Sequence, residues 1–158
     1  MLLHKVYREY HPERPERCQA IYLNLIKKNI WDSLIRIDAV AATEEQLSLA
    51  HSKSHIAKVN NTVMNDKTVK GKQVKMEKFQ NTNRFKVDTY ENLHTCQAAY
   101  LSAGGTIEAV KAVCENSAVY GRVDSSFAIV RPPGHHAHCA DIGGFCFFNN
   151  VAVAARVA

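Results

Sequence analysis

The fold of this chain is decided by residues 130–150, which read VRPPGHHAHCADIGGFCFFNN. Just before this stretch, Ser126–Val130 is a short, apolar and partly β-branched run, which predicts a buried strand. Just after it, Val151–Ala155 consists of small apolar residues, which predicts a buried helix. The stretch itself contains two prolines and three glycines, so it is predicted to form a rigid, tightly turned loop.

This loop is also the candidate site. In an open α/β sheet, ligands bind in the crevice beyond the carboxyl ends of the strands, where a loop after Val130 would lie. His135 and His136 can supply one proton acceptor and one electrostatic partner there near neutral pH. Two other interpretations stay open: solvated or hydrogen-bonded histidines, and a structural zinc cluster, although the usual pair of short Cys/His hooks is absent. That cluster would use His135, His136, His138, Cys139 and Cys146.

Composition and length indicate one ordinary globular domain. A chain of 158 residues can bury a core, and 46% hydrophobic with 22% charged residues is typical of globular proteins. No apolar run of about 18 residues is present, and the N-terminus lacks the apolar region of a signal peptide. Five cysteines without regular spacing fit reduced thiols in the cytosol or nucleus better than a disulfide framework.

The net charge of +5 is unevenly distributed. Between Lys53 and Lys86 there are nine Lys or Arg residues against Asp66 and Glu77. A basic stretch can bind a polyanion, but aromatic residues that could stack on bases are almost absent from it. A solvated loop is therefore favoured, and a polyanion contact is the alternative.

Helices and strands are predicted to alternate along the chain, which indicates an α/β fold with a parallel sheet. The stretch 65–87 is polar and lysine-rich and predicts a loop, and Leu34–Ile37 is a second strand candidate. Thr43 and Gln46 can form a capping box at a helix start. The predicted helices cover about 15–29, a start at 43–46, 52–63, 88–115 and 151–158.

The longest predicted helix has two unusual features. Its large apolar residues are expected to line one face. Gly104 and Gly105 lie inside it, at a cost of about 1 kcal/mol each relative to alanine, which indicates that another backbone approaches closely there. The expected face comprises Leu93, Cys96, Tyr100 and Leu101, followed by Ile107, Val110 and Cys114.

The last predicted helix, 151–158, has no stop signal. It lacks a terminating glycine, a cluster of basic residues in its last turn and a following proline. A helix that is apolar on all sides is expected beneath a larger structure. This pattern favours a piece of a longer domain, and a natural C-terminus that frays is the alternative.

Several segments resemble one family. Residues 131–137 (RPPGHHA) and 144–152 (GFCFFNNVA) resemble the active-site segment of class II zinc-dependent lysine (histone) deacetylases. Upstream, residues 11–17 (HPERPER), 42–52 and 88–105 resemble the same family in the same order. The resemblance covers nearly the whole chain and weakens between Asn60 and Lys86.

The resemblance implies a fold and a chemistry. The fold would be of the arginase/deacetylase type, with a doubly wound parallel sheet and the site at the strand ends. The activity would be hydrolysis of acetyl-lysine, with Zn²⁺ activating a water and a histidine moving protons. His136 resembles the general base and later acid, and His135 its electrostatic partner. Gly144 and Phe145 resemble the wall of the lysine tunnel, Asp88 a residue that holds the substrate backbone, and Arg17 the arginine of the acetate channel.

The family also carries features that residues 1–158 lack. Its zinc ligands lie in an Asp-x-His motif and a later aspartate, and both are expected beyond Ala158, together with the oxyanion tyrosine or its replacement. His138 stands where class II members usually carry an acidic residue. The chain is thus expected to be part of a histone deacetylase catalytic domain, inactive by itself, and the alternative is a non-catalytic fragment that binds protein partners.

The resemblance further implies where such a protein acts. Expected partners are acetylated histone tails, acetylated cytoplasmic proteins such as tubulin, and corepressor proteins. Neither a membrane nor a specific nucleic acid is expected as a partner. The expected location is the nucleus, the cytoplasm or both.

Overall fold

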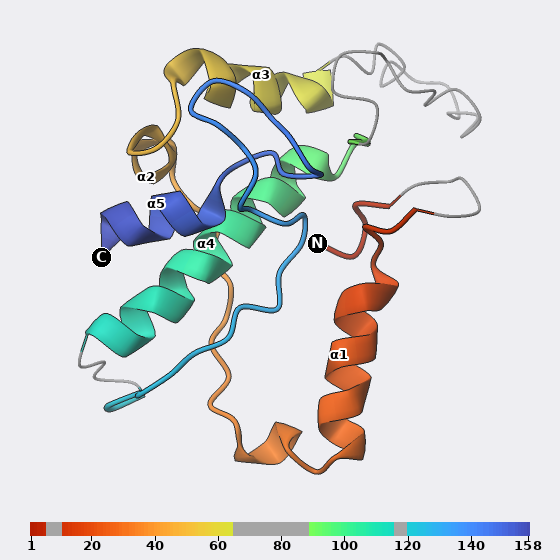
Figure 1. Cartoon of the computed structure of the whole chain (residues 1–158), viewed down its shortest axis with the longest axis vertical. Coiled ribbons are helices and arrows are strands. Elements are labelled where there is room, and N and C mark those ends of the chain that lie inside the picture. The colour runs from red at the N-terminus through yellow and green to blue at the C-terminus, as the bar shows by residue number, and fades with distance from the viewer. Residues whose placement is uncertain (6–10, 65–88, 116–119) are drawn as a thin grey trace.

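The structure, a computed structural model, describes residues 1–5, 11–64, 89–115 and 120–158. Asp88, the predicted loop 65–87 and most of the basic stretch lie outside the described residues. No helix in the described part is long and apolar enough to cross a membrane. The described helices are α1 (Glu16–Lys27), the short 3-10 helix η1 (Trp31–Ser33), α2 (Glu44–Ser48), α3 (Lys53–Met64), α4 (Thr95–Cys114) and α5 (Asn150–Val157) (Figure 1).

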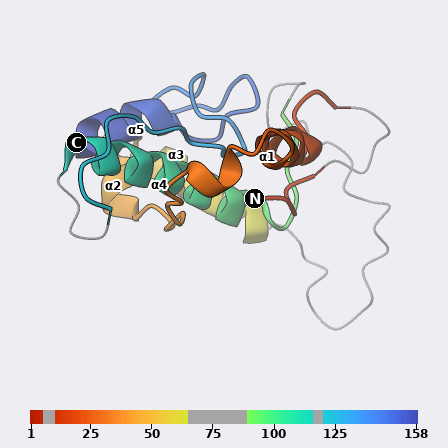
Figure 2. The same ribbon diagram turned by 90° about the horizontal axis from the view of Figure 1, so that it is seen from below.

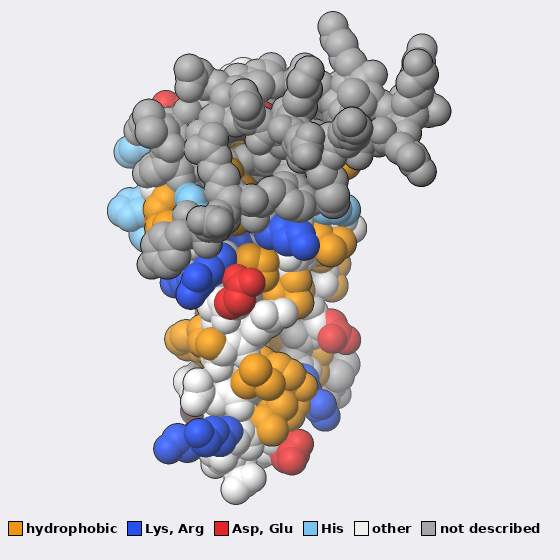
Figure 3. Space-filling model, turned by 90° about the vertical axis from the view of Figure 1, so that its right-hand side faces the viewer, with side chains coloured by type: hydrophobic (Ala, Val, Ile, Leu, Met, Phe, Trp, Pro, Cys, Tyr) orange, Lys and Arg blue, Asp and Glu red, His pale blue; other side chains and the backbone are white. Residues whose placement is uncertain are grey.

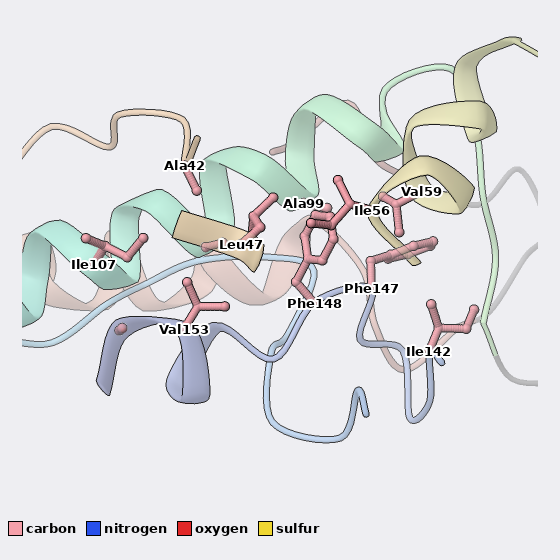
Figure 4. Close-up of a cluster of buried hydrophobic side chains, with 12 residues drawn as sticks. Ala42, Leu47, Ile56, Val59, Ala99, Ile107, Ile142, Phe147, Phe148 and Val153 are labelled. Carbon is pink, nitrogen blue, oxygen red and sulfur yellow. The ribbon is translucent and has the colours of Figure 1, made fainter. Parts of the chain in front are cut away.

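The core forms around α4, which packs against α5 and α3, while α2 packs against α3 and α5. Phe147 and Phe148, at the end of the site loop, are fully buried in it. They lie between α3, α4 and α5 and thereby fix the end of the loop (Figure 4). The cluster comprises Ala42, Leu47, Ile56, Val59, Ala99, Ala103, Ile107, Ile142, Phe147, Phe148, Val153 and Ala154.

Helix α4 begins later than the sequence predicts, at Thr95 instead of Asp88. Side chains at its start hold the backbone in a turn: the Asn92 amide donates to Thr95 Oγ1 at 2.7 Å, and the His94 amide donates to Asn92 Oδ1 at 2.8 Å. Such local bonds offer the backbone an alternative to the helix, so residues 89–94 stay outside it.

The large residues predicted to line one face of α4 are mostly exposed or only partly buried. Small residues form the buried face, including Ala98, Ala99, Ser102 and Ala103, whereas Leu93 is exposed and Cys96, Tyr100 and Leu101 are only partly buried. Ile107 is buried as expected. Small side chains allow neighbouring backbones to come close, so on this helix close packing outweighs the burial of large side chains.

The glycine pair of α4 does receive other backbones, as its sequence predicts. A Cβ on Gly104 would stand 1.7 Å from the carbonyl oxygen of Val40, and one on Gly105 would stand 3.2 Å from the side chains of both Ala39 and Val130. The Ala42 amide donates to the Tyr100 carbonyl oxygen at 3.0 Å, which ties this crossing segment to α4. Two segments far apart in the sequence therefore cross α4 side by side.

The two predicted strands lie on these crossing segments. Neither Leu34–Ile37 nor Phe127–Val130 pairs with another strand among the described residues, where Gly143 and Cys146 form an isolated bridge. Phe127 is 81% exposed and Ile35 is 55% exposed. A strand requires a partner backbone for its amide and carbonyl groups, so the parallel sheet stays a prediction.

The predicted helices at 15–29, 43–46 and 52–63 correspond to α1, α2 and α3. The capping box is present, with the Gln46 amide donating to Thr43 Oγ1 at 3.2 Å and the Thr43 amide donating to Gln46 Oε1 at 2.9 Å. Helix α1 lies to one side of the α2–α5 group and buries none of its residues (Figure 2). Tyr22 packs edge-on against Trp31 at 4.6 Å, and hydrophobic side chains lie at the surface on this side of the molecule (Figure 3).

Candidate active site

His135 and His136 are exposed on the loop that precedes α5. Their ring centroids lie 4.2 Å apart at an interplanar angle of 48°. The backbone amides of both residues point to the sulfur of Cys146, at 3.4 and 3.5 Å. Cys146 is fully buried, and its thiol donates to the Gly144 carbonyl oxygen at 3.2 Å. One buried sulfur thus anchors the backbone under both histidines.

Gly144 and Phe145 lie beside this pair. Both have a left-handed backbone, with φ of 50° and 67°. A Cβ on Gly144 would stand 2.6 Å from Cδ2 of His136, so the missing side chain makes room for the imidazole. Phe145 donates its amide to Thr89 Oγ1 at 3.3 Å, and its ring meets that of His11 edge-on at 5.1 Å. The half-buried Phe145 ring therefore lies next to the segment that follows Asp88.

A buried ion cluster holds the start of the loop. Arg131, only 1% exposed, binds the Glu13 carboxylate with two hydrogen bonds, Nε to Oε1 at 2.8 Å and Nη2 to Oε2 at 2.7 Å. Its Nη2 also donates to the Tyr90 hydroxyl at 2.7 Å, and Tyr90 donates to Glu13 Oε2 at 2.6 Å. Burial, followed by its hydrogen bond to Glu13, raises the pKa of Tyr90. The cluster joins the loop to the segments around residues 13 and 90.

His4 completes this cluster from the N-terminal segment. Its ring stacks on Tyr90 at 4.5 Å, its Nδ1 bonds Thr95 Oγ1 at 3.0 Å, and its carbonyl oxygen accepts from Arg131 Nη1. Burial, followed by the charge of Arg131, lowers the pKa of His4 to about 3. Glu13 Oε2 lies 3.8 Å from His4 Nε2, and Arg131 Nη2 binds the same oxygen at 2.7 Å. His4 is therefore a neutral packing residue.

The far side of the loop is tied to α4 and α5. The Ser102 hydroxyl donates to the Pro132 carbonyl oxygen at 2.6 Å and accepts from Asn150 Nδ2 at 2.8 Å. A Cβ on Gly134 would stand 2.1 Å from Cγ of Asn150, so this glycine permits the close contact. The Asn149 side chain caps α5 by accepting from the Ala152 amide at 3.0 Å.

Sequence reasoning missed His51 and His55, two buried histidines beneath the loop. Their rings stack at 4.8 Å. His51 bonds the His138 carbonyl oxygen through Nδ1 at 3.0 Å, and His55 bonds the Phe147 carbonyl oxygen through Nε2 at 2.7 Å. Burial is the main cause that lowers the pKa of both residues. His51 lies just before α3, and His55 lies in the first turn of that helix.

Arg17 and His138, also singled out from the sequence, contribute no described side-chain contact to the His135–His136 pair. Arg17 lies exposed on the first turn of α1, and Asp88 lies outside the described residues. His138 is exposed and contributes backbone groups, with its amide donating to the Asp141 carbonyl oxygen at 2.8 Å. The assignment of Arg17 to an acetate channel stays a prediction.

Zinc does not fit the side chains described. Among residues 1–5, 11–64, 89–115 and 120–158, no three His, Cys, Asp or Glu residues are grouped so that they could hold a metal ion. His135, His136, His138, Cys139 and Cys146 are all described and do not form such a group. The described loop can move protons and orient a ligand, and no step through a metal follows from it.

Comparison with known proteins adds an independent finding. The sequence-family model of the histone deacetylase domain matches residues 11–158 of this chain. Histone deacetylase HDA1 of Saccharomyces cerevisiae is 36% identical over 95% of this chain and 21% of its own length, and human polyamine deacetylase HDAC10 is 37% identical over 90% and 19%. The crystal structure of the HDA15 HD domain matches with a TM-score of 0.80 at 34% identity, over 99% of this chain and 41% of that one. The chain thus spans about a fifth of the length of these two relatives.

Proposed function

This chain belongs to the histone deacetylase family, and we propose that it supplies the proton-transfer part of the active site in an acetyl-lysine hydrolase. The observation that carries the proposal is the exposed His135–His136 pair, held by one buried sulfur and set against a glycine whose missing side chain accommodates His136. The match to deacetylases over residues 11–158 supports this assignment.

In the proposed reaction, His136 is the general base and then the general acid. It takes a proton from the water that attacks the acetyl carbonyl, and it returns a proton to the lysine amine as the amide bond breaks. We propose that His135, whose ring centroid lies 4.2 Å from that of His136, is its electrostatic partner. Acid–base catalysis of this kind contributes about 10²–10⁴-fold in rate.

We propose that the methylene stem of the substrate lysine passes along Gly144 and Phe145. The Phe145 ring is braced by His11, and its amide is held by Thr89. A flat ring beside a residue without a side chain suits a narrow aliphatic stem. We propose that Asp88, the residue before Thr89 in the sequence, holds the substrate backbone. We propose that Arg17 belongs to the channel through which acetate leaves.

Zinc dependence is part of the proposal, although the described residues do not provide a ligand set. We expect the ligands, and the group that stabilises the oxyanion, to follow Ala158 in a complete deacetylase domain. Acetylated histone tails are the first candidate substrates, followed by acetylated cytoplasmic proteins such as tubulin, in the nucleus or cytoplasm. Acetylated polyamines are included in the test because one relative is named as a polyamine deacetylase.

The test compares residues 1–158 alone with a complete deacetylase domain that contains them. Both proteins are analysed for metal content and assayed with an acetyl-lysine peptide and with acetylspermidine, each with and without a hydroxamate inhibitor. We expect hydroxamate-sensitive turnover of the peptide by the complete domain, and less than one zinc per chain with no turnover for residues 1–158. A folded, zinc-loaded complete domain without deacetylase activity would favour the non-catalytic, protein-binding alternative.

A further inference from the structure

His51 lies beneath the candidate active site and bonds both arms of its loop. Its Nδ1 lies 3.0 Å from the His138 carbonyl oxygen, and its Nε2 lies 2.9 Å from the Asn149 amide nitrogen. The side chain is buried, with the residue only 3% exposed. A single imidazole therefore spans the loop between the arm that carries His135 and His136 and the arm that carries Gly144 and Phe145.

These two bonds define the protonation state of the ring. The Asn149 backbone amide can only donate, so Nε2 of His51 must be the unprotonated acceptor. Nδ1 must then carry the proton and donate to the His138 carbonyl oxygen. A protonated ring would lose the acceptor that Asn149 needs, so the arrangement requires neutral His51. Burial, followed by the neighbouring His55, lowers the pKa of His51 and supports this state.

The ring itself is held rigidly. It stacks on His55 at 4.8 Å and packs against Phe148 at 5.4 Å. His55 lies on α3 and donates to the Phe147 carbonyl oxygen at 2.7 Å, so it holds the second arm at another point. Movement of His51 would therefore disturb α3 and the core, which makes it a firm support for the loop.

Both bonded groups lie close to the proposed reacting residues. His138 follows His136 by two positions, and the Asn149 side chain joins the arms again by donating from Nδ2 to the Ala137 carbonyl oxygen at 3.0 Å. Because backbone positions two residues apart are coupled through few dihedral angles, displacement of His138 shifts the His136 imidazole. Misplacement of a reacting group by about 1 Å can lower a rate by about 10²-fold.

We propose that His51 is a positioning residue of the deacetylase, which holds the histidine arm in register with the Gly144–Phe145 arm. This inference rests on the proposed function. It predicts that loss of the two hydrogen bonds lowers kcat even when the protein stays folded. Loss of a buried hydrogen bond on α3, away from the loop, should lower stability alone.

The experiment compares three variants of the complete domain by kcat, KM and Tm. His51→Phe keeps the ring and removes both bonds, whereas His51→Gln keeps one acceptor and one donor. Thr62→Val is the matched control, because Thr62 is buried on α3 and its hydroxyl donates to the Val59 carbonyl oxygen within the same helix, at 2.8 Å. At a temperature where all variants are folded, we expect kcat to fall about 10- to 100-fold in His51→Phe, and about threefold or less in His51→Gln and Thr62→Val.

Wild-type kcat in folded His51→Phe would overturn the inference, as would equal losses in His51→Phe and Thr62→Val. If His51→Phe does not fold, the ring nitrogen NMR shifts of wild-type His51 decide. The Nδ1–H tautomer supports the inference, and the Nε2–H tautomer or a charged ring at neutral pH contradicts it.

Absence of turnover in the wild type would instead contradict the proposed function. In that case the backbone amide NMR shifts of His135 and His136 test the positioning role. Shifts that are the same in wild type and His51→Phe would overturn it.

Discussion

The imidazole of His136 occupies the space that a side chain on Gly144 would fill, since a Cβ there would stand 2.6 Å from its Cδ2. Gly144→Ala should therefore displace His136 and lower kcat/KM by about 10²-fold, because proton transfer depends on its position. The left-handed φ of 50° adds backbone strain. The measurement is steady-state deacetylation by the complete domain.

Gly121→Ala provides the control for that strain. Gly121 has a φ of 67°, and no heavy atom lies within 4 Å of the Cβ position. We expect this variant to lose about 1 kcal/mol of stability and to keep its activity. Equal activity losses in the two variants would show that backbone strain, and not the contact with His136, causes the effect.

The sequence predicted the helices and the site loop well, because each depends on local signals. The capping box at Thr43 and the prolines and glycines of the loop act over a few residues, and all of them appear as expected. The burial of small residues on α4 was not predicted, because it depends on which backbones cross Gly104, a contact between distant segments. Large apolar residues are a poor guide where small ones permit the closest packing.

The supporting residues of the site were harder to predict for the same reason. Arg131 meets Glu13 across 118 positions and His51 meets Asn149 across 98. Neither contact has a local pattern, so a charge or a histidine in the sequence could equally lie at the surface. The residues proposed to contact substrate were indicated by the motif, whereas the residues that hold the motif in place were visible only in the structure.

The Glu13–Arg131 pair should be essential for stability. Glu13→Gln leaves the Arg131 guanidinium buried without its countercharge, and we expect a loss of about 3–5 kcal/mol in the free energy of unfolding. Urea unfolding monitored by circular dichroism provides the measurement. The matched control is Asp124→Asn, which breaks the Arg122–Asp124 pair at 3.1 Å, whose side chains are 85% and 84% exposed. If the control lost as much stability as Glu13→Gln, burial would not be the cause.

Gly104→Ala and Gly105→Ala should differ sharply although the residues are neighbours on α4. A Cβ at Gly104 would stand 1.7 Å from the Val40 carbonyl oxygen, and this backbone atom can move only if the whole crossing segment moves. A Cβ at Gly105 would stand 3.2 Å from two side-chain atoms. We expect Gly104→Ala to lower stability by about 3 kcal/mol or more. At Gly105, alanine gains about 1 kcal/mol of helix propensity, which offsets most of the crowding. Thermal unfolding of both variants checks the difference, and similar Tm values would contradict it.

Buried His4 should make the protein sensitive to acid. Its pKa is lowered to about 3 in the folded state, so below pH 6.5 the unfolded chain takes up the proton first. Stability is therefore complete above the unfolded pKa and falls as the pH decreases toward the folded pKa. Between about pH 7 and pH 5 this single group accounts for about 2 kcal/mol. Urea unfolding at both pH values should show a smaller loss for His4→Asn than for the wild type, and an unchanged loss would rule out His4 as the cause.

The central claim is that His136 transfers protons and does not bind the metal. The most direct measurement is kcat for an acetyl-lysine peptide, together with zinc content, in the complete domain carrying His136→Ala. His138→Ala, an exposed histidine of the same loop, serves as the control. We expect kcat to fall about 10²–10⁴-fold in His136→Ala with zinc content unchanged, and wild-type turnover in His138→Ala. Retained turnover, or loss of zinc, in His136→Ala would contradict the account.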